Sequence, residues 1–321
     1  MNTVRRQHDS GMARRCVEDA VLFACIAEVG ALKPGNVSVY GAGHGMRVDD
    51  FVVSASAASA ALSRPAERVG ERILRAIQAT RHVVRMNTNL GIVLLCAPLV
   101  HAVFHATSRV SLRDALADVL TTLDDTDACL AYRAIRLAEP GGMGSVGDHD
   151  LSEAEPQVSL LEAMRAAQGR DRIAYQYAHG FRDIFDDLLP RYHTALAHWG
   201  RQEWAIAATY IDTLSSIPDS HIVRRHGHDV ARAVCRRARC VGLELSRHHT
   251  GEASTNALLE FDAELKRRGV NPGTTADLIV ATLTLWRLEK TLPASTVLFD
   301  HGEGNGSGCY SSTVLSRSNL Q

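Results

Sequence analysis

Lysine, aromatic residues and paired cysteines are all scarce in this chain. Only three of the 35 basic residues are lysines, and aromatic residues make up 5% of the 321 positions. The low aromatic content predicts a core of Leu, Val, Ile and Ala, which suits close helix packing. The seven cysteines include no C-x-x-C pair, so we expect reduced thiols in a cytoplasmic protein.

The chain also has no excess of charge of one sign and no long apolar run. The formal net charge is -1, which gives no general attraction to nucleic acid or to acidic membranes. The longest apolar run, 90–100, is too short to span a bilayer and contains Pro98. No signal-type apolar stretch follows the basic N-terminus. We therefore expect a cytosolic protein without a membrane or nucleic-acid partner.

Helical periodicity is the main pattern that is present. Apolar residues recur every three or four positions, which predicts about a dozen helices between residues 11 and 292. Ser111 with Asp114, and Thr274 with Asp277, have the form of capping boxes. We predict an all-α fold, a compact multi-helix single domain over 11–299. A flexible segment at 1–10 precedes it, and a tail of disordered composition at 300–321 follows it.

Three Gly-rich loops interrupt the predicted helices, at 31–50, 139–156 and 268–277. Irregular segments of this length are usually functional or disordered. The polar stretch 87–89 precedes a helix that is apolar on nearly all sides, and its first amides need either an ordinary cap or a bound anion. We expect the loops and this helix start to converge on one active-site pocket.

The stretch Lys33-Pro34-Gly35-Asn36 has two interpretations. Pro34 ends the preceding helix, and Gly35 permits close approach of the backbone to a ligand. The turn therefore either only stops the helix or presents Lys33 to a phosphate. Because the stretch is unlike deep core, we expect Lys33→Ala to weaken ligand binding more than it lowers stability.

The same loop continues to His44, Asp49 and Asp50. The two carboxylates either cap the next helix, hold Mg²⁺ or take a proton from an attacking hydroxyl. His44 lies among glycines, so it is a base, an acid or a surface residue.

Two further stretches combine charge with a helix start. Residues 218–227 contain Asp219, His221, Arg224 and Arg225, which form either a solvated basic face or a phosphate site with a metal. At 271–283, Asp277 is either the cap partner of Thr274 or faces the pocket.

These segments together resemble the triphosphoribosyl-dephospho-CoA synthase family, over roughly residues 16–290. The ordered set is Glu28-Val29, "KPGN" at 33–36, a Gly/His loop leading to Asp, "NTN-G" at 87–91, "DSHIVRR" at 219–225 and "NPGTTADL" at 271–278. The resemblance implies an all-helical transferase that moves the triphosphoribosyl unit of ATP to the 2′-hydroxyl of 3′-dephospho-CoA and releases adenine.

The resemblance also suggests where the site lies, and we expect Mg²⁺ and nucleotide substrates there, in a chain acting alone or as a homodimer. As catalytic candidates we take Asp49, Asp50, His44 and Asp219, of which the three aspartates are also metal candidates. As substrate and phosphate contacts we take Lys33, Gly35, Asn36, Arg85, Asn87, Thr88, Asn89, Gly91, His221, Arg224, Arg225, Asn271, Gly273 and Asp277.

Two departures from the family pattern keep alternatives open. The His and Lys of the family's N-T-H-K-G are replaced by Asn89 and Leu90, and the interval from His44 to the acidic pair is longer. Either Arg81 or Arg85 compensates, or the ligand differs. The alternatives are phosphoribosyl transfer in tetrahydromethanopterin-type cofactor biosynthesis, a non-catalytic nucleotide- or CoA-binding module, and a hydrolase of an N-ribosyl bond.

Overall fold

The computed structural model describes residues 2–107, 109–139, 156–248 and 251–292, with side chains from residue 11 onward. Thirteen α-helices and one π-helical segment make up this part of the chain. The only β pairing within it consists of three isolated bridges. The predicted all-α fold is confirmed.

The elements vary in length from 6 to 29 residues. They are α1 (Asn2–Gly30), α2 (Val48–Leu62), α3 (Val69–Val84), α4 (Leu90–His105), α5 (Leu112–Thr122), α6 (Asp125–Ala138), α7 (Leu160–Ala167), α8 (Arg172–Ala178), η1 (Asp183–Leu188), α9 (Leu189–Trp199), α10 (Gln202–Ser216), α11 (Ser220–His248), α12 (Glu252–Arg267) and α13 (Gly273–Thr291).

The boundaries differ from the prediction at the N-terminus. Helix α1 already begins at Asn2, so residues 2–10 extend the first helix where we predicted a separate flexible segment. The expected tail at 300–321 and nearly all of the loop 139–156 lie outside the described residues. None of the helices that the structure describes is long and apolar enough to cross a membrane.

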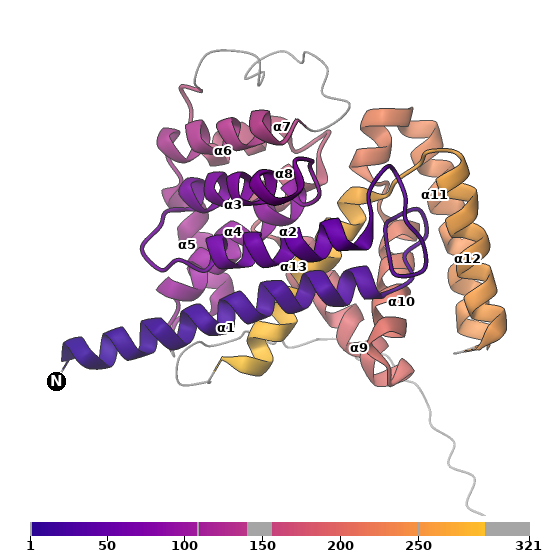
Figure 1. Ribbon diagram of the computed structural model, residues 1–321, viewed down its shortest axis with the longest axis horizontal. Coiled ribbons are helices and arrows are strands. Elements are labelled where there is room, and N and C mark those ends of the chain that lie inside the picture. The colour runs from indigo at the N-terminus through magenta and orange to yellow at the C-terminus, as the bar shows by residue number, and fades with distance from the viewer. Residues whose placement is uncertain (1, 108, 140–155, 249–250, 293–321) are drawn as a thin grey trace, which may run out of the picture.

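Helices α4 and α13 form the centre of the molecule. Every residue of α4 from Gly91 to Val100 is buried, as expected for a helix that is apolar on nearly all sides. Helix α13 contacts α1, α4, α8, α9, α10 and α11, and in Figure 1 it runs through the middle of the molecule, with α6 and α7 on one side and α11 and α12 on the other. The core around these two helices is built mainly from Ala, Leu, Val and Ile, as the low aromatic content predicted.

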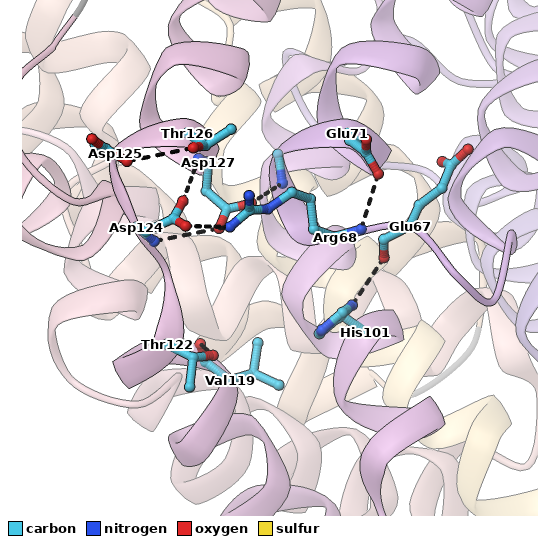
Figure 2. A network of polar contacts seen from close by, with 11 residues as sticks. Glu67, Arg68, Glu71, His101, Val119, Thr122, Asp124, Asp125, Thr126 and Asp127 are labelled. Carbon is cyan, nitrogen blue, oxygen red and sulfur yellow. Dashed lines mark hydrogen bonds and ion pairs between the residues drawn. The ribbon is translucent and has the colours of Figure 1, made fainter.

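A network of polar contacts ties the start of α3 to the start of α6 (Figure 2). The Arg68 guanidinium lies 2.5 Å from Asp124 Oδ2 and 3.1 Å from Asp127 Oδ2. Asp127 also accepts a hydrogen bond from the Gly70 amide at 2.8 Å. A Cβ on Gly70 would lie only 2.7 Å from Asp127 Cα, so glycine is what allows these two helices to approach so closely.

Helix α11 is interrupted after its second turn. Gly227 has φ 85° and ψ 169°, which is not a helical conformation. Residues 220–226 therefore form a short segment that changes direction before the longer, Arg-rich part of the helix. This short segment carries the "SHIVRR" residues of the motif at 219–225.

Candidate active site

The starts of α11 and α13 are joined through one carboxylate. Asp219 Oδ1 accepts a hydrogen bond from the Ile222 amide at 3.0 Å. Its Oδ2 accepts from the Thr275 amide at 2.7 Å and from the Thr275 hydroxyl at 2.8 Å. Asp219 thus caps both helices at once, which fixes their first turns beside each other.

This arrangement bears on the two roles predicted for Asp219. The side chain is 2% exposed, and both oxygens already accept hydrogen bonds. Burial raises the pKa of Asp219, while the hydrogen bonds from Thr275 and Ile222 lower it. These hydrogen bonds give Asp219 a structural role at the two helix starts, and its catalytic and metal-binding roles stay predictions.

The start of α4 lies against the first turn of α13. A Cβ placed on Gly91 would lie 2.0 Å from Asp277 Oδ2 and 2.8 Å from Ile173 Cδ1. Only glycine leaves room for the Asp277 carboxyl at this point. Helices α4, α11 and α13 therefore begin around one cluster of side chains.

The expected capping box of Thr274 and Asp277 is not formed. Thr274 Oγ1 instead accepts a hydrogen bond from the His221 amide at 3.2 Å and lies 3.0 Å from Ser220 Oγ. Helix α13 has Pro272 at its N-cap, whose side chain makes no cap hydrogen bond. Asp277 instead lies against Gly91, and the other interpretation, that it faces the pocket, stays a prediction.

The surroundings of Asp277 disfavour its charged form. Burial raises its pKa well above the usual range, and the carboxylates of Asp219, Glu28 and Asp171 raise it further. Arg224 acts in the opposite direction but has the smallest effect of these groups. Its guanidinium lies 3.3 Å from Asp171 Oδ2.

The polar stretch 87–89 divides its side chains among three partners. Asn87 Oδ1 accepts from the Leu90 amide at 3.1 Å and so provides an ordinary cap for α4. The Thr88 hydroxyl donates to Ser54 Oγ in α2 at 2.7 Å. Asn89 donates to Thr80 Oγ1 in α3 at 2.9 Å, while its buried Oδ1 has no hydrogen-bond partner.

The cap leaves part of the α4 start unsatisfied. Within the described residues, the amides of Gly91 and Ile92 have no acceptor, and the same holds for those of Gly273 and Thr274 at the start of α13. Unpaired amides at a helix start carry partial positive charge and suit an anion. The ordinary cap is thus observed at this helix start, and the anion site stays a prediction.

Each residue of the stretch 33–36 takes part in a hydrogen bond or an ion pair. The Lys33 ammonium lies 2.9 Å from Glu28 Oε1 and donates to the Val37 carbonyl at 2.9 Å. The Tyr210 hydroxyl donates to the Pro34 carbonyl at 2.9 Å, and the Gly35 amide donates to Asp262 Oδ1 at 2.9 Å. Asn36 Nδ2 donates to Asn271 Oδ1 at 3.0 Å.

Lys33 is therefore not where we expected it. Its side chain is 0% exposed and Glu28 is its ion-pair partner. Burial lowers the pKa of Lys33, while Glu28 raises it. The expectation that the stretch lies outside the deep core is wrong, and the ammonium is not open to a phosphate in this conformation.

Glycines allow the two Gly-rich loops to touch. Gly35 has φ +82°, and a Cβ there would lie 2.8 Å from Pro272 Cδ. A Cβ on Gly273 would lie 2.6 Å from His221 Nδ1. His44 Nε2 is 2.9 Å from the Gly35 carbonyl. Loops 31–50 and 268–277 thus meet, as predicted.

His221 lies at this junction with one ring nitrogen unused. Its Nε2 is buried and has no hydrogen-bond partner. Burial lowers its pKa to about 4, and the nearby charges of Arg224, Arg225 and His44 act in the same direction. His221 is therefore neutral near pH 7, and its buried Nε2 keeps its hydrogen-bonding capacity unused within the described residues.

Comparison with known proteins shows what these segments have in common. The model of the ATP:dephospho-CoA triphosphoribosyl transferase family (CitG) matches residues 14–296, which includes every segment of the cluster. The chain belongs to this family.

Two members illustrate how far the likeness extends. A 2-(5″-triphosphoribosyl)-3′-dephosphocoenzyme-A synthase of Pectobacterium atrosepticum is 26% identical over 167 residues, which cover 51% of this chain and 48% of that protein. The chain thus spans about half the length of this curated relative. A crystal structure from Archaeoglobus fulgidus, provisionally assigned as a triphosphoribosyl-dephospho-CoA synthase, has a TM-score of 0.58 and 25% identity, and the match covers 73% of this chain and 98% of that one.

Not all expected site residues join the cluster of this family member. Asp50 accepts a hydrogen bond from the Arg47 amide at 2.7 Å and so caps α2, which supports the capping interpretation. Asp49, Arg85 and Arg225 are exposed, and no described hydrogen bond or ion pair connects their side chains to the cluster. The part of the site expected from loop 139–156 lies outside the described residues.

Several residues that organise the cluster were missed from the sequence. Asp171 pairs with Arg224, Asp262 holds the Gly35 amide, and Tyr210 holds the Pro34 carbonyl. Each lies far from the motif it supports along the chain, so no local spacing indicates it. Glu28 is different, because it stands in the family pattern five residues before Lys33 and its charge was the available signal.

Proposed function

We propose that this protein transfers the triphosphoribosyl group of ATP to the 2′-hydroxyl of 3′-dephospho-CoA and releases adenine. The observation that carries this proposal is the meeting of the family's motif segments around the starts of α4, α11 and α13. The Pectobacterium relative is named for the product of such a transfer. Because segments this far apart in the chain share one cluster, a common task for them is the simplest explanation.

The unpaired amides suit the triphosphate. Gly91 and Ile92 at α4, and Gly273 and Thr274 at α13, offer N–H groups at two adjoining helix starts. The family's His and Lys at this place are replaced by Asn89 and Leu90. In this member, backbone donors and the field of two helices would supply the positive potential that those side chains give elsewhere.

Mg²⁺ fits as a companion of the substrate. Among the described residues, no group of three or more His, Cys, Asp or Glu side chains is arranged to hold a metal. Mg²⁺ is commonly bound by one or two carboxylates together with substrate phosphates. Asp49, exposed in the first turn of α2, is the carboxylate of the predicted set that suits this role, with Asp50 beside it.

The reaction requires little beyond positioning and proton transfer. The bond between C1′ of the ATP ribose and the adenine nitrogen breaks through an oxocarbenium-like state, and a bond from C1′ to the acceptor oxygen forms. The Nε2 of His221, which has no partner within the described residues, would accept a hydrogen bond from a substrate hydroxyl that reaches it. His44 has its Nε2 on the Gly35 carbonyl, so only its Nδ1 remains for a ligand.

A direct assay tests this function. Purified protein is incubated with MgATP and 3′-dephospho-CoA, and adenine is measured by chromatography while the mass of the CoA product is determined. We expect adenine and the triphosphoribosylated product in equal amounts. Absence of adenine above background would contradict the proposal.

Omission controls separate the alternatives. Adenine released without any acceptor would indicate a hydrolase, and nucleotide binding without adenine would indicate a binding module. The replacement of the family's His and Lys by Asn89 and Leu90 favours one second candidate, in which the acceptor is a pterin-pathway ribosyl compound. Release of adenine with that acceptor alone would support it.

A further inference from the structure

We propose that Asp277 is the proton donor of this site, which protonates the purine base as it leaves the ribose. The inference rests on the proposed function, because it requires a nucleotide whose N-glycosidic bond is broken here. It assigns a catalytic role to a residue for which the sequence indicated only a cap or a contact.

The place of Asp277 is fixed by packing. It lies in the first turn of α13, and its Oδ2 occupies the space that a Cβ on Gly91 would fill. The unpaired amides of Gly91 and Ile92 lie at the start of α4, where Gly91 meets Asp277. A nucleotide whose phosphates bind these amides brings its ribose into the region of the Asp277 carboxyl.

The other carboxylates near Asp277 are already engaged. Asp219 accepts three hydrogen bonds from Ile222 and Thr275. Glu28 is paired with Lys33. Asp171 caps α8 through Oδ1 and meets Arg224 through Oδ2.

Asp277 differs from all three. Within the described part of the chain, neither of its oxygens has a hydrogen-bond donor or an ion-pair partner, and the residue keeps some accessibility to solvent. A carboxyl with no internal partner, bordering the cluster, is available to a ligand. The carboxylates around it also favour its neutral form, which is the form that can give a proton.

The step balances as follows. The bond between C1′ and the adenine nitrogen breaks, and its electron pair goes to the base, which takes the proton of Asp277 on a ring nitrogen. The acceptor hydroxyl forms the new bond to C1′ and loses its proton, which restores the Asp277 carboxyl by way of solvent. Neutral adenine leaves, and no oxidant or reductant is needed.

The test compares two leaving groups in Asp277→Asn, a substitution of nearly the same size. With MgATP and 3′-dephospho-CoA, we expect adenine release to fall by about 10²–10⁴-fold, the usual contribution of a general acid. Nicotinamide riboside 5′-triphosphate carries a base that leaves as a neutral molecule without a proton. With this donor we expect the variant to lose less than about tenfold.

The ratio of the two rates within one preparation does not depend on the fraction of folded protein. A merely structural role would lower both rates equally and leave this ratio unchanged, which would overturn the inference. Asp212→Asn is the control, since this carboxyl is exposed and lies in α10, outside the cluster. We expect it to keep the wild-type ratio and rate.

The remaining outcomes are equally decisive. An Asp277→Asn variant that releases adenine at the wild-type rate overturns the inference and leaves the proposed function intact. A wild-type protein that transfers from neither donor overturns the proposed function, and the role of Asp277 falls with it.

Discussion

At the residue scale, the ion pair of Glu28 and Lys33 has the largest expected effect on stability. Both side chains are nearly inaccessible to water, so replacing Lys33 by Met leaves Glu28 buried and unpaired. Such a loss costs about 3–5 kcal/mol of unfolding free energy. We expect the unfolding free energy of Lys33→Met, measured by denaturant unfolding, to be lower than that of the wild type by this amount.

Two further variants show whether the pair is responsible. Lys290→Met, at an exposed position in the last turn of α13, should change stability by no more than about 0.5 kcal/mol. The double variant Glu28→Gln with Lys33→Met should recover part of the loss, because no charge remains buried. A Lys33→Met protein as stable as wild type would show that the ammonium is solvated after all.

The contact of Gly91 with Asp277 gives a second prediction at this scale. Gly91→Ala places a methyl group where Asp277 Oδ2 lies, at 2.0 Å, so the carboxyl or the helix must move. We expect adenine release to fall by at least about tenfold, measured under saturating MgATP. Gly242→Ala in α11, whose Cβ would meet Ile211 Cγ2 at an ordinary 3.5 Å, should leave the rate unchanged.

At the element scale, Asp219 holds two helix starts together. Asp219→Ala removes acceptors from Ile222 in α11 and from Thr275 in α13. Loss of one cap costs about 0.5–2 kcal/mol. For the loss of two caps we therefore expect the unfolding free energy, measured with denaturant, to decrease by about 1–4 kcal/mol. A variant with full stability but no activity would instead return Asp219 to the catalytic role first predicted for it.

Asp229→Ala provides the control for this comparison. Asp229 belongs to the same helix but its side chain is 96% exposed in a pair with Arg232. Exposed pairs contribute at most about 1 kcal/mol, so the variant should unfold close to wild type.

The helices themselves were largely predictable, because their signals are local. The apolar run of α4 and the cap of Ser111 on the Asp114 amide both depend on neighbouring residues. The box of Thr274 and Asp277 failed for a tertiary reason, since Thr274 accepts from the His221 amide of another helix. A sequence pattern cannot show that competing donor.

The site was predictable as a set of segments but not as a set of roles. That 33–36, 87–91, 219–225 and 271–277 belong together follows from the family resemblance. Which carboxylate is occupied and which is available depends on partners such as Thr275 and Lys33, which only the packing brings into place. Lys33 shows the same limit, since its charge was visible and its burial was not.

At the scale of the whole molecule, buried histidines link stability to pH. Burial lowers the pKa of His101 to about 4, helped by His105 and Arg72, and its Nδ1 lies 3.1 Å from the Glu67 carbonyl. Because the folded value lies below the unfolded value of about 6.5, its contribution is present above pH 6.5 and is lost as pH falls toward 4.

The measurement compares wild type with His101→Gln at several pH values. As pH falls from 6.5 to 4, we expect the unfolding free energy of the wild type to decrease more than that of the variant. His228→Gln, at an exposed position of α11, serves as the control and should follow the wild-type curve. A difference that stays constant over this range would mean that His101 has the same pKa in the folded and the unfolded protein.

The break at Gly227 has a mechanical consequence for the whole molecule. The segment 220–226 is bonded sideways, to α13 through Thr274 and to α8 through the Arg172 amide on Ser220, while the regular hydrogen-bond ladder of α11 is interrupted just beyond it. The position of His221 is therefore set by the bonds of this segment to α8 and α13, and not by the direction of the longer part of α11.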